Sequence, residues 1–156
     1  MRLTSVNAKR LYSLPPFELR SIEANECKRF GLDPVEALKK NISESVETSA
    51  IFLEGKLVAV WGYRVSSYMS GTALPWVLAT KDSEHFPYRF ARSARFVFDY
   101  LLRFYNCIEV TASKEHDKAI RLLMKNKFLA IDQYDAFDMT FIIFKRERNQ
   151  GEGTRH

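Results

Sequence analysis

The sequence predicts an α+β domain in which a mixed central sheet of about seven strands lies between four helices, in α/β/α layers. Between residues 72 and 128 the patterns run strand, polar connector, long helix, strand, helix. This order is typical of neighbouring strands with a helix packed across them. A second observation is the nearly continuous apolar run at residues 57–61, which indicates a strand buried on both faces.

The N-terminal part of the chain predicts one strand and two helices. Residues 1–7 alternate weakly and predict the strand. The two prolines at 15–16 would open a helix that Gly31 ends, because proline fits a first helical turn and glycine the left-handed conformation that follows a helix. Asp33 then predicts the cap of a second helix, with proline at the first helical position.

Three strands follow these helices. Residues 49–53 and 56–65 predict a hairpin around a tight Glu-Gly turn. The third strand, at residues 72–79, contains Pro75. Proline removes a donor from the hydrogen-bond ladder, so we expect a bulge or a sheet edge at this position.

The long helix is predicted from Pro87 to about Tyr105. Its apolar positions recur at helical spacing, and they are Phe90, Ala94, Val97, Phe98, Leu101, Leu102 and Tyr105. Three arginines, at 89, 92 and 95, crowd the N-terminal end of this helix, where the helix dipole favours anions. They predict either a solvated basic face or an anion site.

The remaining patterns complete the predicted domain, which covers residues 1–145. We expect strands at 107–112, 128–131 and 136–144, a helix at 116–126, and a flexible tail at 146–156. The two tryptophans, Trp61 and Trp76, are expected to fill the core rather than to bind a ligand.

Composition narrows the class of protein. The chain has 156 residues, 46% of them hydrophobic, and a formal net charge of +5. No apolar run approaches the ~20 residues that span a bilayer, and two cysteines form neither a disulfide framework nor a metal-ligand pattern. We therefore expect no membrane contact, no metal site and a reducing cytosol. The basic residues are spread out and form no nucleic-acid-binding motif, so charge alone makes a polyanion-binding module only a third hypothesis.

The order of predicted elements resembles the GNAT acyl-CoA N-acyltransferase fold of the acetyltransferase superfamily. Within it, the sequence is similar to the GNAT-like internal virion protein A family of T7-like podophages. The segments that carry this likeness are Arg20-x-x-Glu23-x-x-Glu26, Gly31-Leu32-Asp33-Pro34-x-x-Ala37-Leu38, Leu57-Val58-Ala59-Val60-Trp61-Gly62, Pro75-Trp76-Val77-Leu78-Ala79-Thr80, Phe90-x-Arg92-x-x-Arg95 and Ile120-Arg121-Leu122-Leu123.

The resemblance implies an acetyl-CoA site between the fourth and fifth strands, with an amine as the acyl acceptor. The cofactor-binding candidates are Leu78, Ala79, Thr80, Tyr88, Arg89 and Arg92. The first three would hold the pantetheine arm through their backbone, and the two arginines would face the phosphates. Glu109 and His85 are the catalytic candidates, because they are the titratable groups near the implied crevice.

The sequence also departs from the superfamily pattern. The expected R/Q-x-x-G-x-G/A loop contains no glycine here, and Asp82 and Glu84 would repel phosphates. Leu123 stands where a general-acid tyrosine is usual. These departures favour the alternative, a GNAT-fold protein without catalysis that acts in virion assembly or binds a host or phage protein. In either case we expect the host cytoplasm, or association with the virion.

Overall fold

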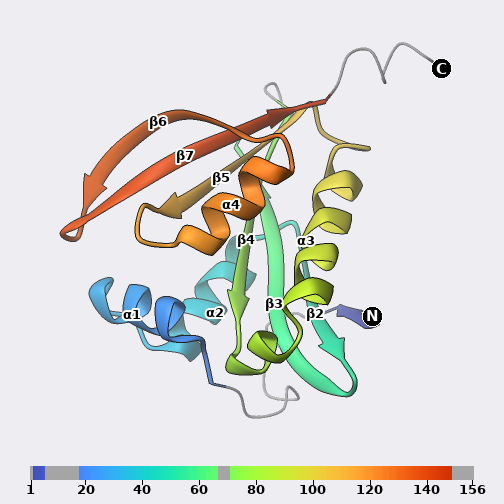
Figure 1. Cartoon of the computed structure of the whole chain (residues 1–156), viewed down its shortest axis with the longest axis vertical. Helices are drawn as coiled ribbons and strands as arrows, with labels where there is room; N and C mark the ends of the chain where they lie inside the picture. The colour runs from blue at the N-terminus through green and yellow to red at the C-terminus, as the bar shows by residue number, and fades with distance from the viewer. Residues whose placement is uncertain (1, 6–17, 67–70, 149–156) are drawn as a thin grey trace. The chain divides into compact units, whose positions relative to one another are not determined.

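The computed structural model describes residues 2–5, 18–66 and 71–148 (Figure 1). These residues form seven strands, four α-helices and a 3-10 helix, in the predicted α+β class. In chain order the elements are β1 (Arg2–Ser5), α1 (Ser21–Arg29), α2 (Pro34–Glu44), β2 (Glu47–Leu53), β3 (Lys56–Val65), β4 (Thr72–Ala79), the 3-10 helix η2 (Lys81–His85), α3 (Pro87–Leu101), β5 (Cys107–Ser113), α4 (Asp117–Lys125), β6 (Leu129–Ala136) and β7 (Met139–Glu147).

The strand order is β1-β2-β3-β4-β5-β7-β6, with β4 and β5 parallel. The chain divides into two compact units: unit 1 comprises residues 1–64 and 75–93, and unit 2 comprises residues 65–74 and 94–156. Three elements contribute to both units, because the division falls before the last residue of β3, inside β4 and inside α3. The single domain predicted over residues 1–145 stays a prediction.

In unit 1, α2 begins where the sequence predicts. The Asp33 side chain accepts a hydrogen bond from the Glu36 N–H at 2.8 Å, and Pro34 occupies the first helical position. This cap satisfies one of the backbone donors that the first turn of a helix leaves without an intrahelical partner. The apolar side of α2 is buried, at Ala37, Leu38 and Ile42.

The first helix starts later than predicted. α1 begins at Ser21, and Leu19 lies before it in an extended bridge to Thr80. The predicted start at 15–16 lies outside the described residues. Gly31 follows the helix with φ +72°, a backbone conformation in which glycine avoids the steric cost of a Cβ atom, as predicted.

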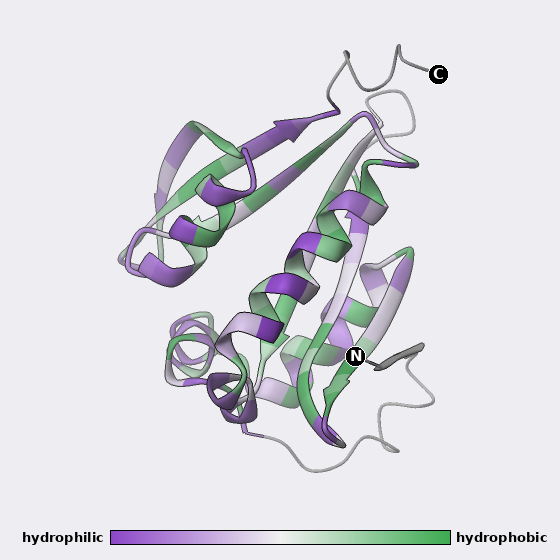
Figure 2. Ribbon diagram, turned by 45° about the vertical axis from the view of Figure 1, so that its right-hand side comes forward, coloured by the Kyte–Doolittle hydropathy of each residue, from purple (hydrophilic) through white to green (hydrophobic). Residues whose placement is uncertain are grey.

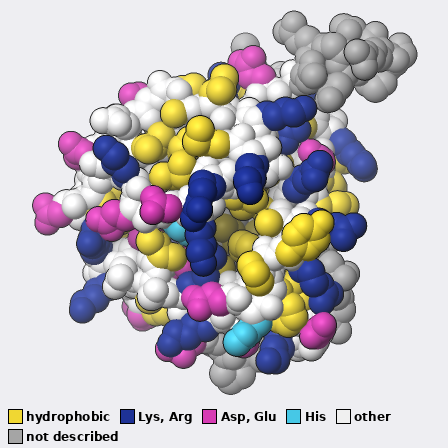
Figure 3. Space-filling model, viewed as in Figure 1, with side chains coloured by type: hydrophobic (Ala, Val, Ile, Leu, Met, Phe, Trp, Pro, Cys, Tyr) yellow, Lys and Arg dark blue, Asp and Glu magenta, His cyan; other side chains and the backbone are white. Residues whose placement is uncertain are grey.

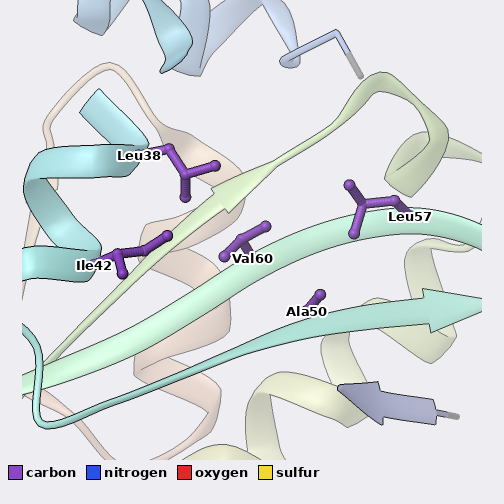
Figure 4. Close-up of a cluster of buried hydrophobic side chains, with 5 residues drawn as sticks. All are labelled: Leu38, Ile42, Ala50, Leu57 and Val60. Atoms are coloured by element: carbon purple, nitrogen blue, oxygen red, sulfur yellow. The ribbon is translucent and has the colours of Figure 1, made fainter. Parts of the chain in front are cut away.

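A cluster of aliphatic side chains forms the core of unit 1 (Figure 4). Leu38 and Ile42 point from α2 toward the sheet, where they meet Val60 and Leu57 of β3 and Ala50 of β2. Burying each of the larger aliphatic side chains contributes on the order of 1.5–3 kcal/mol. Residues 57–63 of β3 are all buried, which confirms that this strand has no solvent-facing side over most of its length.

The β2–β3 hairpin turns at Glu54 and Gly55, with φ values of 51° and 78°. Two successive residues with positive φ make the tight turn that matches the twist of antiparallel strands. The hairpin prediction is therefore confirmed, although β2 begins at Glu47, two residues before the predicted start.

Trp76 is partly buried and packs against the core, in keeping with the prediction. Its indole Nε1 donates a hydrogen bond of 2.6 Å to the Ser45 Oγ at the end of α2, and its ring packs against the aliphatic cluster. A Cβ atom on Gly62 would lie 2.8 Å from the Trp76 Cζ2 and 2.7 Å from the Glu47 carbonyl oxygen. Only glycine leaves room for the ring at that place on β3.

In unit 2, β7 runs farther than the domain end predicted at residue 145. Arg146 and Glu147 pair with Ile108 and Cys107 of β5, so the flexible tail predicted from residue 146 is wrong at its start. The side chains at the end of β7 are polar, so the sequence showed no strand pattern there. Backbone pairing does not need apolar side chains. Residues 149–156 of the predicted tail lie outside the described residues.

The boundary between the last two strands is also a correction. The sequence predicts strands at 128–131 and 136–144, whereas β6 extends to Ala136 and the turn consists of Phe137 and Asp138, with φ values of 53° and 59°. Nearly the whole of β6 is exposed, so no buried alternation marked it in the sequence.

The long helix keeps its predicted start and apolar stripe but ends early. Figure 2 shows hydrophobic and hydrophilic residues alternating along α3. The helix ends at Leu101, and the next residues, up to the predicted end near Tyr105, make tighter turns. In unit 2, the Phe98 ring meets Phe128 edge-on at 4.9 Å between centroids, which ties the helix to the segment after α4.

Candidate functional site: the free edge of β4

The last residues of β4 present their backbone groups to two different edges. The Thr80 N–H donates to the Val58 carbonyl oxygen of β3 at 2.9 Å. Backbone groups alternate along a strand, so those of Leu78 and Thr80 face β3 and those of Val77 and Ala79 face the opposite edge. A pantetheine arm lying along that edge would therefore meet the backbone of Val77 and Ala79. The predicted role of Ala79 stays a prediction, whereas the backbones of Leu78 and Thr80 are turned away.

The parallel pairing of β4 with β5 lies in unit 2 and is short. Its register consists of Thr72 with Cys107 and Ala73 with Ile108. Both pairs precede Pro75, which has no N–H to give to a ladder. The Thr72 hydroxyl and the Cys107 thiol lie 3.0 Å apart, and both residues are buried. Cys107 is therefore a small packed side chain.

A segment before α1 lies along the outer edge of β4 at its end, and sequence analysis missed it. The Arg20 N–H donates to the Ala79 carbonyl oxygen at 3.1 Å, and the Lys81 N–H donates to the Glu18 carbonyl oxygen at 2.8 Å. Between them, Leu19 is 3% exposed and pairs with Thr80. We call residues 18–20 the N-terminal strap. The only sequence signal is an isolated leucine between polar residues, which predicts no pairing.

Side chains hold the strap in place within unit 1. The Arg20 guanidinium forms an ion pair with Glu23, which is only 5% exposed, and lies 5.4 Å from the centroid of the Phe90 ring. At the other end, the Lys81 Nζ lies 2.6 Å from a Glu18 carboxylate oxygen. The hydrogen bond and the charge of Glu18 raise the pKa of Lys81.

The polar connector after β4 is a 3-10 helix rather than an open loop. The Ser83 N–H and hydroxyl both donate to the Thr80 carbonyl oxygen, at 3.1 and 2.7 Å. The Phe86 N–H donates to the Ser83 carbonyl oxygen at 3.0 Å. The Thr80 hydroxyl donates to the Leu57 carbonyl oxygen at 2.7 Å. The hydrogen-bond donors of this connector are thus largely used within the protein.

The remaining cofactor-binding candidates lie on the first turns of α3 in unit 1. Tyr88 is 76% exposed. The Arg89 guanidinium contacts the Glu54 carboxylate at 3.2 Å and lies 5.7 Å from the Phe86 ring centroid. Arg92 is exposed, and no ion pair joins its guanidinium to another residue in the described ranges. Arg89 is thus already paired with a carboxylate.

The two catalytic candidates belong to different units. His85 ends η2 in unit 1 and is exposed, whereas Glu109 lies half-buried on β5 in unit 2, opposite Lys145. Leu123 of α4, at the position where the resemblance expects a tyrosine, is 3% exposed. The roles of His85 and Glu109 stay predictions.

Two other kinds of feature are absent from the described residues. In the described ranges, no helix has the length and apolarity to cross a membrane. The same ranges hold no group of three metal-ligating side chains. Figure 3 shows lysine and arginine side chains spread over the face in view, with acidic side chains among them. Spread charge of this kind is typical of a solvated basic surface.

Comparison with solved structures identifies the fold. An aminoglycoside acetyltransferase, AAC(6')-Ib, in complex with coenzyme A is similar with a TM-score of 0.70 and 18% identity, over 99% of this chain and 98% of that chain. A chimera of spermidine N-acetyltransferase SpeG from Vibrio cholerae and hSSAT gives a TM-score of 0.63 and 10% identity, over 95% and 97%. The protein smu.2055 from Streptococcus mutans gives 0.65 and 8%, over 96% and 100%.

The first two of these proteins are GNAT acetyltransferases, so the predicted GNAT fold is confirmed. No protein-family model and no curated protein sequence matches the chain.

Proposed function

We propose that this chain is an N-acetyltransferase-like protein that takes an acetyl group from acetyl-CoA and transfers it to an amine. The observation that supports this most directly is the edge of β4 at Val77 and Ala79, which faces away from β3. A pantetheine arm carries two amide groups, and an extended chain of amides can pair with such an edge as another strand would. Solved neighbours of the same fold include one in complex with coenzyme A.

The transfer itself needs little from the protein beyond positioning and proton movement. The amine nitrogen attacks the thioester carbonyl, the C–N bond forms as the C–S bond breaks, the amine loses a proton and the departing thiolate gains one. Glu109 or His85 would accept the amine proton, directly or through water. Leu123 has no proton to give, so the thiolate would be protonated by water.

A second function is supported by the same departures from the family pattern. Buried Leu123 and the internally bonded connector fit a GNAT scaffold without catalysis, one that acts in virion assembly or binds a host or phage protein. Such a protein would be found in the host cytoplasm or in the virion.

Thermal unfolding with acetyl-CoA tests the donor site. A ligand that binds only the folded state stabilises it, by about 2.7 kcal/mol when the ligand concentration is 100 times its Kd. The melting temperature rises as a result. We expect a progressive rise up to millimolar acetyl-CoA. An unchanged melting temperature would show that the donor proposal is wrong.

Release of free coenzyme A thiol then tests turnover, with spermidine and an aminoglycoside as acceptors. If Glu109 is the base, Glu109→Gln lowers turnover by about 10²-fold or more while leaving the shift with acetyl-CoA unchanged. His85→Gln is the matched variant for the other candidate. A melting shift without thiol release from any amine would favour the scaffold function.

A further inference from the structure

We propose that this chain recognises the acylated pantetheine arm of its donor, and that the described residues of unit 1 form no site for the nucleotide phosphates. The inference rests on the proposed function, since it takes the β4 edge as the donor site. It narrows the substrate class to thioesters of pantetheine, whatever carries the other end of the arm. Three features of unit 1 support it. Backbone donors near the end of β4 already make hydrogen bonds within the protein, carboxylates compete for the nearby cations, and the connector contains no glycine.

The backbone donors where β4 ends are already used. The Lys81 N–H donates to Glu18 of the strap, the Ser83 N–H to Thr80, and the Phe86 N–H to Ser83. The proline that opens α3 has no N–H, which leaves its first turn one donor fewer than usual. A phosphate group bound at the N–H groups of Lys81, Ser83 or Phe86 would have to replace protein hydrogen bonds rather than satisfy free donors.

The charges of this region do not favour phosphates either. Lys81 is held by Glu18 at 2.6 Å, and Arg89 by Glu54 at 3.2 Å. Asp82 and Glu84 lie in the connector itself. Lys81 and Arg89 therefore each have a competing carboxylate, and the two connector carboxylates repel an anion.

The connector also lacks the shape of a phosphate cradle. Between Thr80 and Arg89 there is no glycine, whose missing Cβ allows backbone to approach a ligand closely. The hydroxyl groups of Thr80 and Ser83 could bind an anion, but they donate to the carbonyl oxygens of Leu57 and Thr80. Both residues are buried, at 3% and 2% exposure.

The edge of β4 along which the pantetheine arm would lie differs from the connector. In unit 1, the strap reaches the Ala79 carbonyl oxygen and no described residue of that unit continues along the edge toward Val77. Val77 is itself 45% exposed. The two N–H groups of Val77 and Ala79 and the Val77 carbonyl thus suit the amides of a pantetheine arm.

The decisive experiment compares the dissociation constants of S-acetylpantetheine, S-acetyl-4'-phosphopantetheine and acetyl-CoA by calorimetry. We expect all three within about threefold, because exposed charge contacts contribute little to affinity. Acetyl-CoA binding tenfold or more tightly than S-acetylpantetheine would overturn the inference while supporting the proposed function. No binding of any of the three at millimolar concentration would overturn both.

Two variants sharpen this comparison. Val77→Pro removes an edge N–H without touching the β3 ladder, so we expect all three ligands to bind about three- to tenfold more weakly. Val77→Ala keeps the N–H and is the control, and thermal unfolding without ligand checks that both variants fold. Arg92→Ala should change the affinity for acetyl-CoA by less than about threefold. A selective loss of acetyl-CoA binding in Arg92→Ala would reveal a phosphate site and overturn the inference.

Discussion

The carbonyl oxygen of Glu18 accepts a hydrogen bond from the Lys81 N–H at 2.8 Å, and this contact joins two parts of the chain that are 63 positions apart (81 − 18). It closes the outer edge of β4 at its end and brings a glutamate carboxylate to the lysine ammonium. The strap therefore shapes the candidate donor site. The first two predictions concern the side chains that hold it.

Leu19→Ala should destabilise the protein by about 2–5 kcal/mol, the usual cost of truncating a buried leucine. Leu19 is 3% exposed and packs with Cys27 and Ala37, so its removal leaves a cavity under the strap. Urea unfolding measures the change. Val35→Ala, at a side chain 47% exposed on α2, is the control and should cost much less. Equal losses in the two variants would show that the strap is not packed as described.

Arg20→Ala should cost about 3 kcal/mol, because it leaves the buried Glu23 carboxylate without its partner. Replacing both residues together, as Arg20→Met with Glu23→Leu, should recover most of the loss, since no charge then remains buried. Arg64→Ala breaks the exposed pair with Glu44 and should cost no more than about 1 kcal/mol. A double variant no more stable than Arg20→Ala would contradict the prediction.

Gly62→Ala should destabilise unit 1 by about 1–3 kcal/mol through overpacking. The new methyl group would meet the Glu47 carbonyl oxygen at 2.7 Å and the Trp76 ring at 2.8 Å. We expect a lower melting temperature and a change in tryptophan fluorescence, because the ring must shift from Ser45. Gly31→Ala is a useful comparison, since it has open space around it and only the cost of a positive φ. An unchanged fluorescence spectrum in Gly62→Ala would argue against the packing.

Stability should fall above pH 9 because of Cys27. Burial, followed by the nearby carboxylates of Glu26, Glu23 and Asp33, raises the pKa of this thiol above its ordinary value of 9.0. The folded chain therefore keeps a proton that the unfolded chain loses, so the stabilisation is complete below pH 9 and decreases as the pH rises through the raised pKa.

Chemical denaturation between pH 8 and 10.5 measures this decrease, and Cys27→Ala should make it smaller. Lys81, whose own pKa is raised above its ordinary value of 10.5, contributes equally to both variants, so the comparison with Cys27→Ala cancels it. A steeper loss in Cys27→Ala than in the natural sequence would contradict the assignment to this thiol.

Much of the fold was predictable because its signals are local. The Asp33 cap, the tight turn at Glu54 and the apolar stripe of the long helix each depend on residues a few positions apart. The predictions failed where a strand lacks a buried face. β6 is exposed along nearly its whole length, and the end of β7 is polar, so neither alternation nor an apolar run marked them.

The sequence by itself determined the order of strands and helices, the missing glycines of the connector and the leucine at position 123, since these follow from residue identity and short-range pattern. Only the tertiary structure decided which backbone groups near the end of β4 face outward and which are used. That outcome depends on the backbone hydrogen bonds of Thr80 with Val58 and of Lys81 with Glu18, and backbone hydrogen bonds between distant residues leave no trace in side-chain identity.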